Sequence, residues 1–247
     1  MMEPENRIRE DVASNTAKEF AQLATLSPLF RKALESMHSG EPQVGSAGTP
    51  VAIDDSTRIL IEEGMALYSL VVAEQATSTL EVGLGYGFST VYLLAGLAQI
   101  GGGHHTAIDP YQERDWSGIG ETTARRLTTA SPELTPESFT LVNERSFPAL
   151  GQFIRDGRTF DLTFIDGYHR FDDVLVDFTI AARICRMGGV IVLHDMWLDS
   201  VTAVAMFLRH NRPDFAEIET GCDNLFAVRR IDADRREWSH FADFPLR

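Results

Sequence analysis

The sequence predicts an α/β protein with a mostly parallel β-sheet that helices cover on both faces. Between residues 79 and 210, short and continuously apolar segments alternate with longer segments of helical periodicity. The last two strand-like segments, 215–218 and 225–228, have only a short link between them and should pair as an antiparallel hairpin at one edge. This alternation favours a doubly wound sheet, in which ligands bind at the carboxyl ends of the strands.

The first fifty residues are expected to form a helical cap or dimerisation segment and a linker, followed by one catalytic domain over residues 51–247. Ser27-Pro28 is a helix-start signal that interrupts an apolar stripe, so two helices are expected. The Gly- and Pro-rich segment 41–50 should be a loop. The stripe consists of Val12, Phe20, Leu23, Phe30, Leu34 and Met37.

The elements of the catalytic domain are expected in alternating order. Asp54-Asp55-Ser56 should cap a helix, and Gly188-Gly189 should end the helix at 171–186. The capped helix carries Ile59, Leu60, Leu67, Leu70 and Val71. Strands are expected at 79–82, 105–108, 139–142, 160–165 and 190–193, and further helices at 88–99, 121–129, 147–155, 171–186 and 201–210.

The composition is that of an acidic globular protein. The 247 residues include 22 Lys and Arg against 36 Asp and Glu, which gives a formal net charge of −14. A nucleic-acid partner is not expected, because it would need a basic stripe. No membrane span and no secretory signal are expected, because no run of about 18 apolar residues occurs and the first ten residues are polar. Cys185 and Cys222, which form no CxxC pattern, fit a cytoplasmic protein.

A glycine-rich loop follows the first strand of the domain, in the sequence EVGLGYGFS at 81–89. Its glycines let the backbone approach a ligand, and the following helix presents free N–H groups. A dinucleotide fingerprint would need a small residue at the position of Phe88. The GxGxG spacing, with Glu81 two residues before Gly83, resembles the class I S-adenosylmethionine-dependent methyltransferases.

An acidic residue, Asp109, ends the second strand, twenty-two residues after Gly87. A carboxylate at this position can accept hydrogen bonds from both hydroxyls of a ribose. By itself it could equally cap a turn. Together with the glycine loop it favours an adenosine-containing ligand.

The segments FDLTFIDGYHRFDDVLVDF at 160–178 and GGVIVLHDMW at 188–197 extend the resemblance. They are similar to a bacterial small-molecule branch of these enzymes that is itself similar to catechol-type O-methyltransferases. The resemblance runs from about residue 53 to residue 230. It implies a Rossmann-like seven-stranded sheet of order 3-2-1-4-5-7-6, a small-molecule acceptor and a homodimer or higher homo-oligomer.

The same resemblance assigns roles to particular residues. The cofactor S-adenosylmethionine would lie on Glu81, Gly83, Gly85, Tyr86, Gly87, Ser89, Asp109, Arg145, Ser146 and Asp166. A divalent metal, Mg²⁺ or Mn²⁺, would bind Asp166, His194 and Asp195, although not every relative uses a metal, and a histidine ligand shifts the preference away from Mg²⁺. Without a metal, Asp166 would orient the cofactor and His194-Asp195 would pack the pocket floor.

A catalytic base is expected at His169, in the position where catechol-type enzymes carry a lysine. An imidazole can take the proton of a hydroxyl near neutral pH, with Asp166 as the second catalytic residue. His169 could instead be a hydrogen-bonded structural residue, as is expected of His104 and His105. Four aromatic residues on loops at this end could stack on adenine or on a planar acceptor, or could pack the core: Tyr86, Trp116, Tyr168 and Trp197.

Three other functions stay open at this point. A nicotinamide-dependent oxidoreductase uses a similar sheet, but Phe88 and the terminal hairpin speak against it. A metal-dependent hydrolase could use Asp166, His169, His194 and Asp195, but would leave the glycine loop unexplained. A non-catalytic cofactor-binding or assembly protein would keep the loop and lack a working base.

Overall fold

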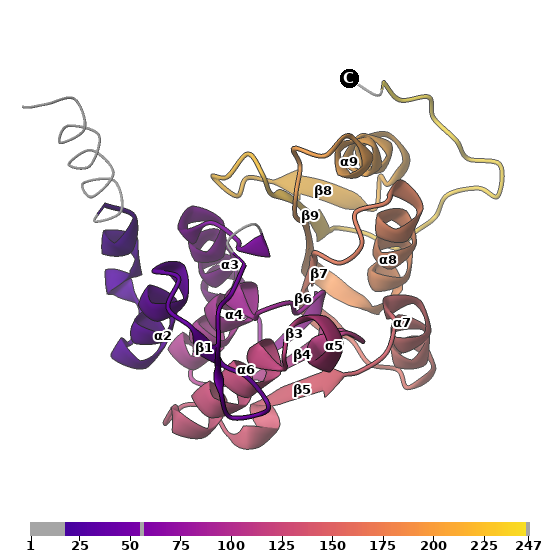
Figure 1. Ribbon diagram of the computed structural model, residues 1–247. Helices are drawn as coiled ribbons and strands as arrows, with labels where there is room; N and C mark the ends of the chain where they lie inside the picture. Colours follow the sequence, from indigo (N-terminus) through magenta and orange to yellow (C-terminus); the bar gives the residue numbers. More distant parts are fainter. Residues whose placement is uncertain (1–17, 55–56, 246–247) are drawn as a thin grey trace, which may run out of the picture.

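The computed structural model describes residues 18–54 and 57–245, and its centre is a seven-stranded sheet. The strand order is β5-β4-β3-β6-β7-β9-β8 (Figure 1), which confirms the predicted order 3-2-1-4-5-7-6. All neighbours pair in parallel except β9, which is antiparallel to β7 and β8 and closes the predicted edge hairpin. The strands are β3 (Ser78–Val82), β4 (His104–Ile108), β5 (Phe139–Val142), β6 (Phe160–Ile165), β7 (Cys185–Leu193), β8 (Phe215–Ile218) and β9 (Phe226–Arg230).

Helices cover both faces of this sheet (Figure 1). One face packs against α3 (Ile61–Glu74), α4 (Phe88–Gln99) and α6 (Ile119–Ala130), the other against α7 (Ser146–Arg155), α8 (Phe171–Ile184) and α9 (Asp199–Asn211). Alternate residues of β7 enter opposite layers: Val190 and Val192 join the core of the first face, Ile191 and Leu193 that of the second. Within the described ranges, no helix is long and apolar enough to cross a membrane.

The N-terminal segment packs onto the first of these layers. Helix α2 (Pro28–His38) begins at Pro28, as predicted, and its Phe30, Leu34 and Met37 join the core cluster of α3 and α4. The part of the predicted first helix that contains Val12 lies outside the described residues; residues 18–22 are helical, and a 3-10 turn, Leu23–Thr25, follows them before α2. The expected loop at 41–50 contains one side of a short antiparallel pair, β1 (Gln43–Val44) with β2 (Pro50–Val51).

Two predicted helix boundaries are wrong. Helix α3 begins at Ile61, because the Glu63 carboxylate accepts the backbone N–H of Leu60 at 2.7 Å and caps the helix there; Ile59 and Leu60 therefore precede it. Of the predicted cap, Asp55 and Ser56 lie outside the described residues. Helix α8 ends at Ile184, and Gly188-Gly189 lies within β7. The strand starts early because Cys185 already pairs with Phe160 of β6.

Candidate active site

A cavity of about 580 Å³ opens at the carboxyl ends of the parallel strands. Its walls come from the segments that follow β3, β4, β5, β6 and β7, and from residues 57–59 before α3. The strands leave the sheet at nearly the same level, since Asp166 N–H bonds to the carbonyl of Val82 at 2.9 Å and His194 N–H to that of Ile165 at 3.2 Å. Residues far apart in sequence therefore meet at one point, as the doubly wound fold predicts.

The glycine loop between β3 and α4 lines this cavity. Gly83, Gly85 and Gly87 all have positive φ, of 93°, 54° and 86°, and Gly87 is the N-cap of α4. A Cβ on Gly83 would lie 2.2 Å from the backbone oxygen of Asp166, whereas a Cβ on Gly85 would meet nothing within 4 Å. The loop is thus pressed against the β6 terminus on one side and open to the cavity at Gly85.

Asp109 holds this loop in place from the end of β4. Its carboxylate is 4% exposed and accepts the backbone N–H of Gly85 at 3.0 Å and that of Tyr111 at 2.7 Å. Gln112 donates to the same carboxylate at 2.9 Å and to the Gly85 carbonyl at 2.8 Å. Sequence reasoning missed Gln112, because a lone glutamine in a loop carries no motif. The glycine loop and Asp109, which the sequence predicts to act together, are therefore in direct contact.

Glu81 does not line the cavity, contrary to its predicted contact with the cofactor. It is fully buried, its carboxylate accepts the hydroxyls of Ser89 and Thr90, and His105 Nε2 lies 3.2 Å away. His105 is also 2.9 Å from the Thr79 hydroxyl, in line with the structural role expected for it. Glu81 therefore fixes the first turn of α4, including Ser89, which does line the cavity.

Asp166, His169 and Asp195, which follow β6 and β7, also line the cavity. His169 Nε2 lies 3.3 Å from Asp166 Oδ1 and 3.2 Å from Asp195 Oδ2. The hydrogen bond to Asp166 raises the pKa of His169 above its ordinary value, and the charges of both carboxylates act in the same direction. Asp195 has a positive φ of 62°, rare for a non-glycine residue. The predicted base and two predicted carboxylates therefore do come together.

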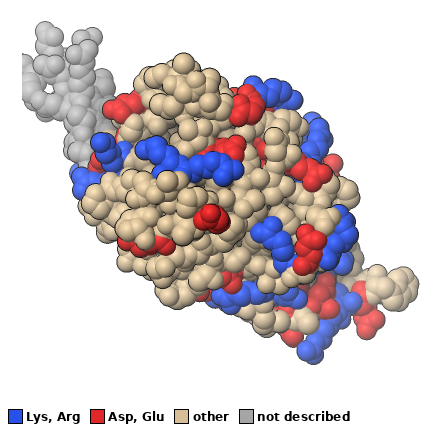
Figure 2. Space-filling view, turned by 90° about the horizontal axis from the view of Figure 1, so that it is seen from below, with Lys and Arg blue, Asp and Glu red and all other residues tan. Residues whose placement is uncertain are grey.

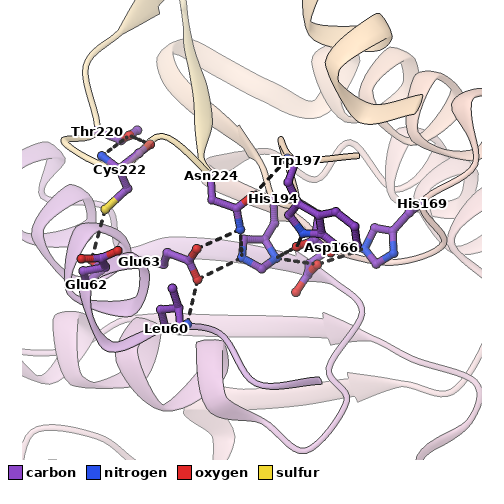
Figure 3. Close-up of polar contacts among 11 residues, drawn as sticks. Leu60, Glu62, Glu63, Asp166, His169, His194, Trp197, Thr220, Cys222 and Asn224 are labelled. Carbon is purple, nitrogen blue, oxygen red and sulfur yellow. Dashed lines mark hydrogen bonds and ion pairs between the residues drawn. The ribbon is translucent and has the colours of Figure 1, made fainter. Parts of the chain in front are cut away.

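His194 lies behind this group, between two carboxylates (Figure 3). Its Nδ1 is 3.0 Å from Asp166 Oδ1 and its Nε2 is 3.2 Å from Glu63 Oε2. Burial alone would lower the pKa of His194, but the Asp166 charge and the hydrogen bonds to Asp166 and Glu63 outweigh it and raise the pKa to about 10. Both ring nitrogens of His194 therefore face carboxylates, and its predicted role as a metal ligand stays a prediction.

The three residues that could hold a metal ion are Asp166, His169 and Asp195, whose candidate ligand atoms lie within 4.8 Å of one another. Two carboxylate oxygens and an imidazole nitrogen suit Mn²⁺, Fe²⁺ or Zn²⁺ better than Mg²⁺. The donor chemistry therefore fits a divalent ion, with His169 in place of His194.

Aromatic residues line the cavity beside the glycine loop. Tyr86 packs edge-on against Trp116, with ring centroids 5.0 Å apart, and Tyr111 packs against Tyr168 at 6.3 Å. Trp197 is not part of the lining: it is 72% exposed, and its indole N–H donates to Asp195 Oδ1 at 2.9 Å. Three of the four predicted aromatic residues therefore share the cavity.

Arg145 and Ser146, at the start of α7, also line the cavity. Ser146 hydrogen-bonds to Asp177 of α8, which is 3% exposed, and burial raises the pKa of Asp177 to about 6. The predicted loop beyond β5 is thus tied to a buried carboxyl group that sequence reasoning did not identify.

This carboxyl group should make stability depend on pH. The folded-state pKa of Asp177 lies above its ordinary 3.8, so its contribution is full below that value and is lost as the pH rises through about 6. We expect Asp177→Asn to gain roughly 2–3 kcal/mol of unfolding free energy relative to wild type between about pH 4 and pH 7. Urea unfolding at several pH values measures this change. Asp172→Asn, on the exposed side of the same helix, is the control, and equal pH profiles for both variants would contradict the assignment.

The face seen in Figure 2 carries acidic and basic side chains side by side, with large uncharged areas between them.

Comparisons with known proteins agree with the cavity and the topology. Residues 80–196 match the model of a family described as a methyltransferase domain. A search of curated proteins found no match.

Similar folds occur among solved structures. An O-methyltransferase from Bacillus cereus in complex with SAH has a TM-score of 0.58 at 17% identity, with 83% of this chain and 91% of that chain covered. The O-methyltransferase TomG from Streptomyces achromogenes, involved in tomaymycin synthesis and solved with SAM, has a TM-score of 0.57 at 19% identity, with 94% and 100% covered. The methyltransferase PaMTH1 from Podospora anserina, bound to SAH, has a TM-score of 0.57 at 12% identity, with 94% and 99% covered.

At these identities the similarity to the solved structures concerns the fold alone. The family match covers the segment that builds most of the cavity. The strand order 3-2-1-4-5-7-6 is that of the class I methyltransferase fold, and within it residues 80–196 match the methyltransferase domain family.

Proposed function

We propose that this methyltransferase moves the methyl group of S-adenosylmethionine to a hydroxyl oxygen of a small molecule. The observation that carries the proposal is one cavity lined by two sets of residues. The glycine loop and Asp109 are suited to a nucleoside, and His169 with its two carboxylates is suited to proton removal. Methyl transfer needs both sets, because the donor and the acceptor oxygen must be aligned in line.

The cofactor would lie along the loop that Asp109 and Gln112 hold. Gly85 offers open backbone toward it, the Asp109 carboxylate would accept the ribose hydroxyls, and Arg145-Ser146 would flank the adenine. The carboxylates of Asp109, Asp166 and Asp195 all line this cavity. Such a negatively charged lining favours binding of the cationic sulfonium of the cofactor. These carboxylates are part of the acidic composition of the chain.

His169 would remove the proton of the acceptor. Because carboxylates only accept hydrogen bonds, Asp166 and Asp195 keep a proton on His169 Nε2, and Nδ1 is then the free base. His169 Nδ1 would take the proton of the acceptor O–H as the methyl group moves from the sulfonium sulfur to the acceptor oxygen. Asp166 and Asp195 stabilise the imidazolium that results.

A divalent ion on Asp166, His169 and Asp195 would be another way to activate the acceptor hydroxyl. When bound, it would lower the pKa of the acceptor hydroxyl and fix the position of its oxygen. It would also displace the proton from His169 Nε2. We propose the metal-free arrangement, because both carboxylates already lie within hydrogen-bonding distance of that nitrogen.

Transfer of a labelled methyl group tests the proposal. The full chain is incubated with S-adenosylmethionine labelled in the methyl group and with matched sets of phenols, sugar alcohols, carboxylic acids and amines. Each reaction is run with EDTA and again with Mn²⁺ or Mg²⁺. We expect label on a hydroxyl compound and equal rates in EDTA. Label on amines alone would contradict O-methylation, and label only with added metal would contradict the role of His169 Nε2.

A further inference from the structure

Two polar residues outside the matched segment 80–196 reach the back of the site from opposite ends of the chain. Glu63 lies in the first turn of α3, and Asn224 lies in the link between β8 and β9. Figure 3 shows both on the side of His194 that faces away from Asp166 and His169. Neither residue carries a recognisable motif in the sequence.

The orientation of the Glu63 carboxylate is fully determined by its neighbours. Oε2 accepts the Leu60 backbone N–H at 2.7 Å and faces His194 Nε2 at 3.2 Å, while Oε1 accepts the Asn224 side-chain amide at 2.8 Å. Glu63 is 2% exposed. Both oxygens of this buried carboxylate are therefore engaged, and these three contacts fix its orientation.

Asn224 extends the network to the loop after β7. Its side-chain oxygen accepts the Trp197 backbone N–H at 3.3 Å, and its backbone carbonyl accepts the Met196 N–H at 3.4 Å. The same loop contains Asp195, with its positive φ. Asn224 thus connects Glu63 to the segment that carries one of the two carboxylates on His169.

Stabilisation of helix α3 does not by itself account for this buried arrangement of charged groups. Buried charged groups lose their hydration, and a buried ion pair adds little net stability compared with apolar packing. The contacts of Glu63 instead lead toward the cavity. Glu63 contacts His194, His194 contacts Asp166 at 3.0 Å, and Asp166 contacts His169 at 3.3 Å. In Figure 3 these four side chains lie in a row.

We propose that Glu63 and Asn224 are positioning residues for methyl transfer: they fix His194, which in turn fixes the Asp166 carboxylate and the ring of His169. The inference rests on the proposed function of His169 as the base. It gives the segments on both sides of the matched segment 80–196 a part in the chemistry, through contacts that do not touch the substrate.

Imidazole NMR tests the transmission without any ligand. Ring ¹⁵N–¹H spectra of the full chain are recorded at pH 7 in EDTA, with signals assigned from His194→Gln and His169→Gln. We expect Glu63→Gln to shift the signals of both His194 and His169, although Glu63 contacts only the former. Glu62→Gln, the same change one residue away on the exposed side of α3, should shift neither. A shift confined to His194, or equal spectra for both variants, would overturn the proposal.

Two further measurements guard against a trivial explanation. If Glu63→Gln lowers the yield of folded protein, Asn224→Ala serves instead. It removes one partner of the carboxylate and should shift the NMR signals of the same two histidines by a smaller amount.

With an acceptor from the labelling experiment, Glu63→Gln should lower kcat roughly tenfold or more with little change in KM for S-adenosylmethionine. An unchanged kcat would contradict a positioning role. Failure of the wild type to transfer methyl groups would refute the proposed function alone, since the NMR result stands independently.

Discussion

Replacement of His169 with glutamine is expected to lower kcat for methyl transfer by about 10²–10⁴-fold, the usual contribution of a general base. Glutamine retains hydrogen-bonding capacity toward Asp166 and Asp195 but cannot accept the acceptor's proton at neutral pH. The affinity for S-adenosylmethionine should change little, because the contacts that hold the glycine loop come from Asp109 and Gln112. Steady-state kinetics with an acceptor from the labelling experiment measure the first effect, and calorimetry measures the second.

His210→Gln is the matched control for this substitution. His210 is exposed at the end of α9, where its Nδ1 lies 2.8 Å from the Met206 carbonyl. We expect wild-type kinetics for this variant. If His169→Gln retained wild-type kcat, His169 would not be the base, and a non-catalytic or differently catalysed site would be the better interpretation.

Gly83→Ala is expected to destabilise the protein by about 3–5 kcal/mol. The new Cβ would lie 2.2 Å from the backbone oxygen of Asp166, at a φ of 93° that side chains rarely adopt. Neither the end of β3 nor that of β6 can move away without breaking sheet hydrogen bonds. Urea unfolding measures the loss, and the same variant should bind S-adenosylmethionine poorly because the loop is displaced.

Gly85→Ala separates backbone strain from the steric clash. Its φ of 54° is also positive, but a Cβ there would meet nothing within 4 Å. The expected cost is only about 1–2 kcal/mol. Equal losses for the two alanine variants would show that the close approach of Gly83 to Asp166 is not what requires glycine.

The parts of this molecule that follow from local pattern could be predicted from the sequence. Continuous apolar runs such as 160–165 and 190–193 gave the strands, and the carboxyl-end rule placed Gly83, Asp109 and Asp166 at one edge. Helix ends were less predictable. At α3 the side chain of Glu63 competes with the apparent Asp54 cap, and only the folded chain decides between them.

The second layer of the site could not be predicted, because it depends on contacts distant in sequence. Glu63 and His194 are 131 residues apart, and nothing local marks either as a partner of the other. His194 appeared to be a metal ligand because it follows a strand beside Asp195. The folded chain adds the Glu63 carboxylate on the far side of His194 and places His169 Nε2 against the two aspartates.

Calorimetric titration of the full chain with S-adenosylmethionine and, separately, with NAD⁺ tests the central claim most directly. Both ligands contain adenosine, so a site that only recognises a ribose and an adenine would bind both. We expect saturable heat with S-adenosylmethionine and none with NAD⁺, because Phe88 stands where a dinucleotide site needs a small residue. Tight binding of NAD⁺ without heat from S-adenosylmethionine would contradict the assignment and favour an oxidoreductase.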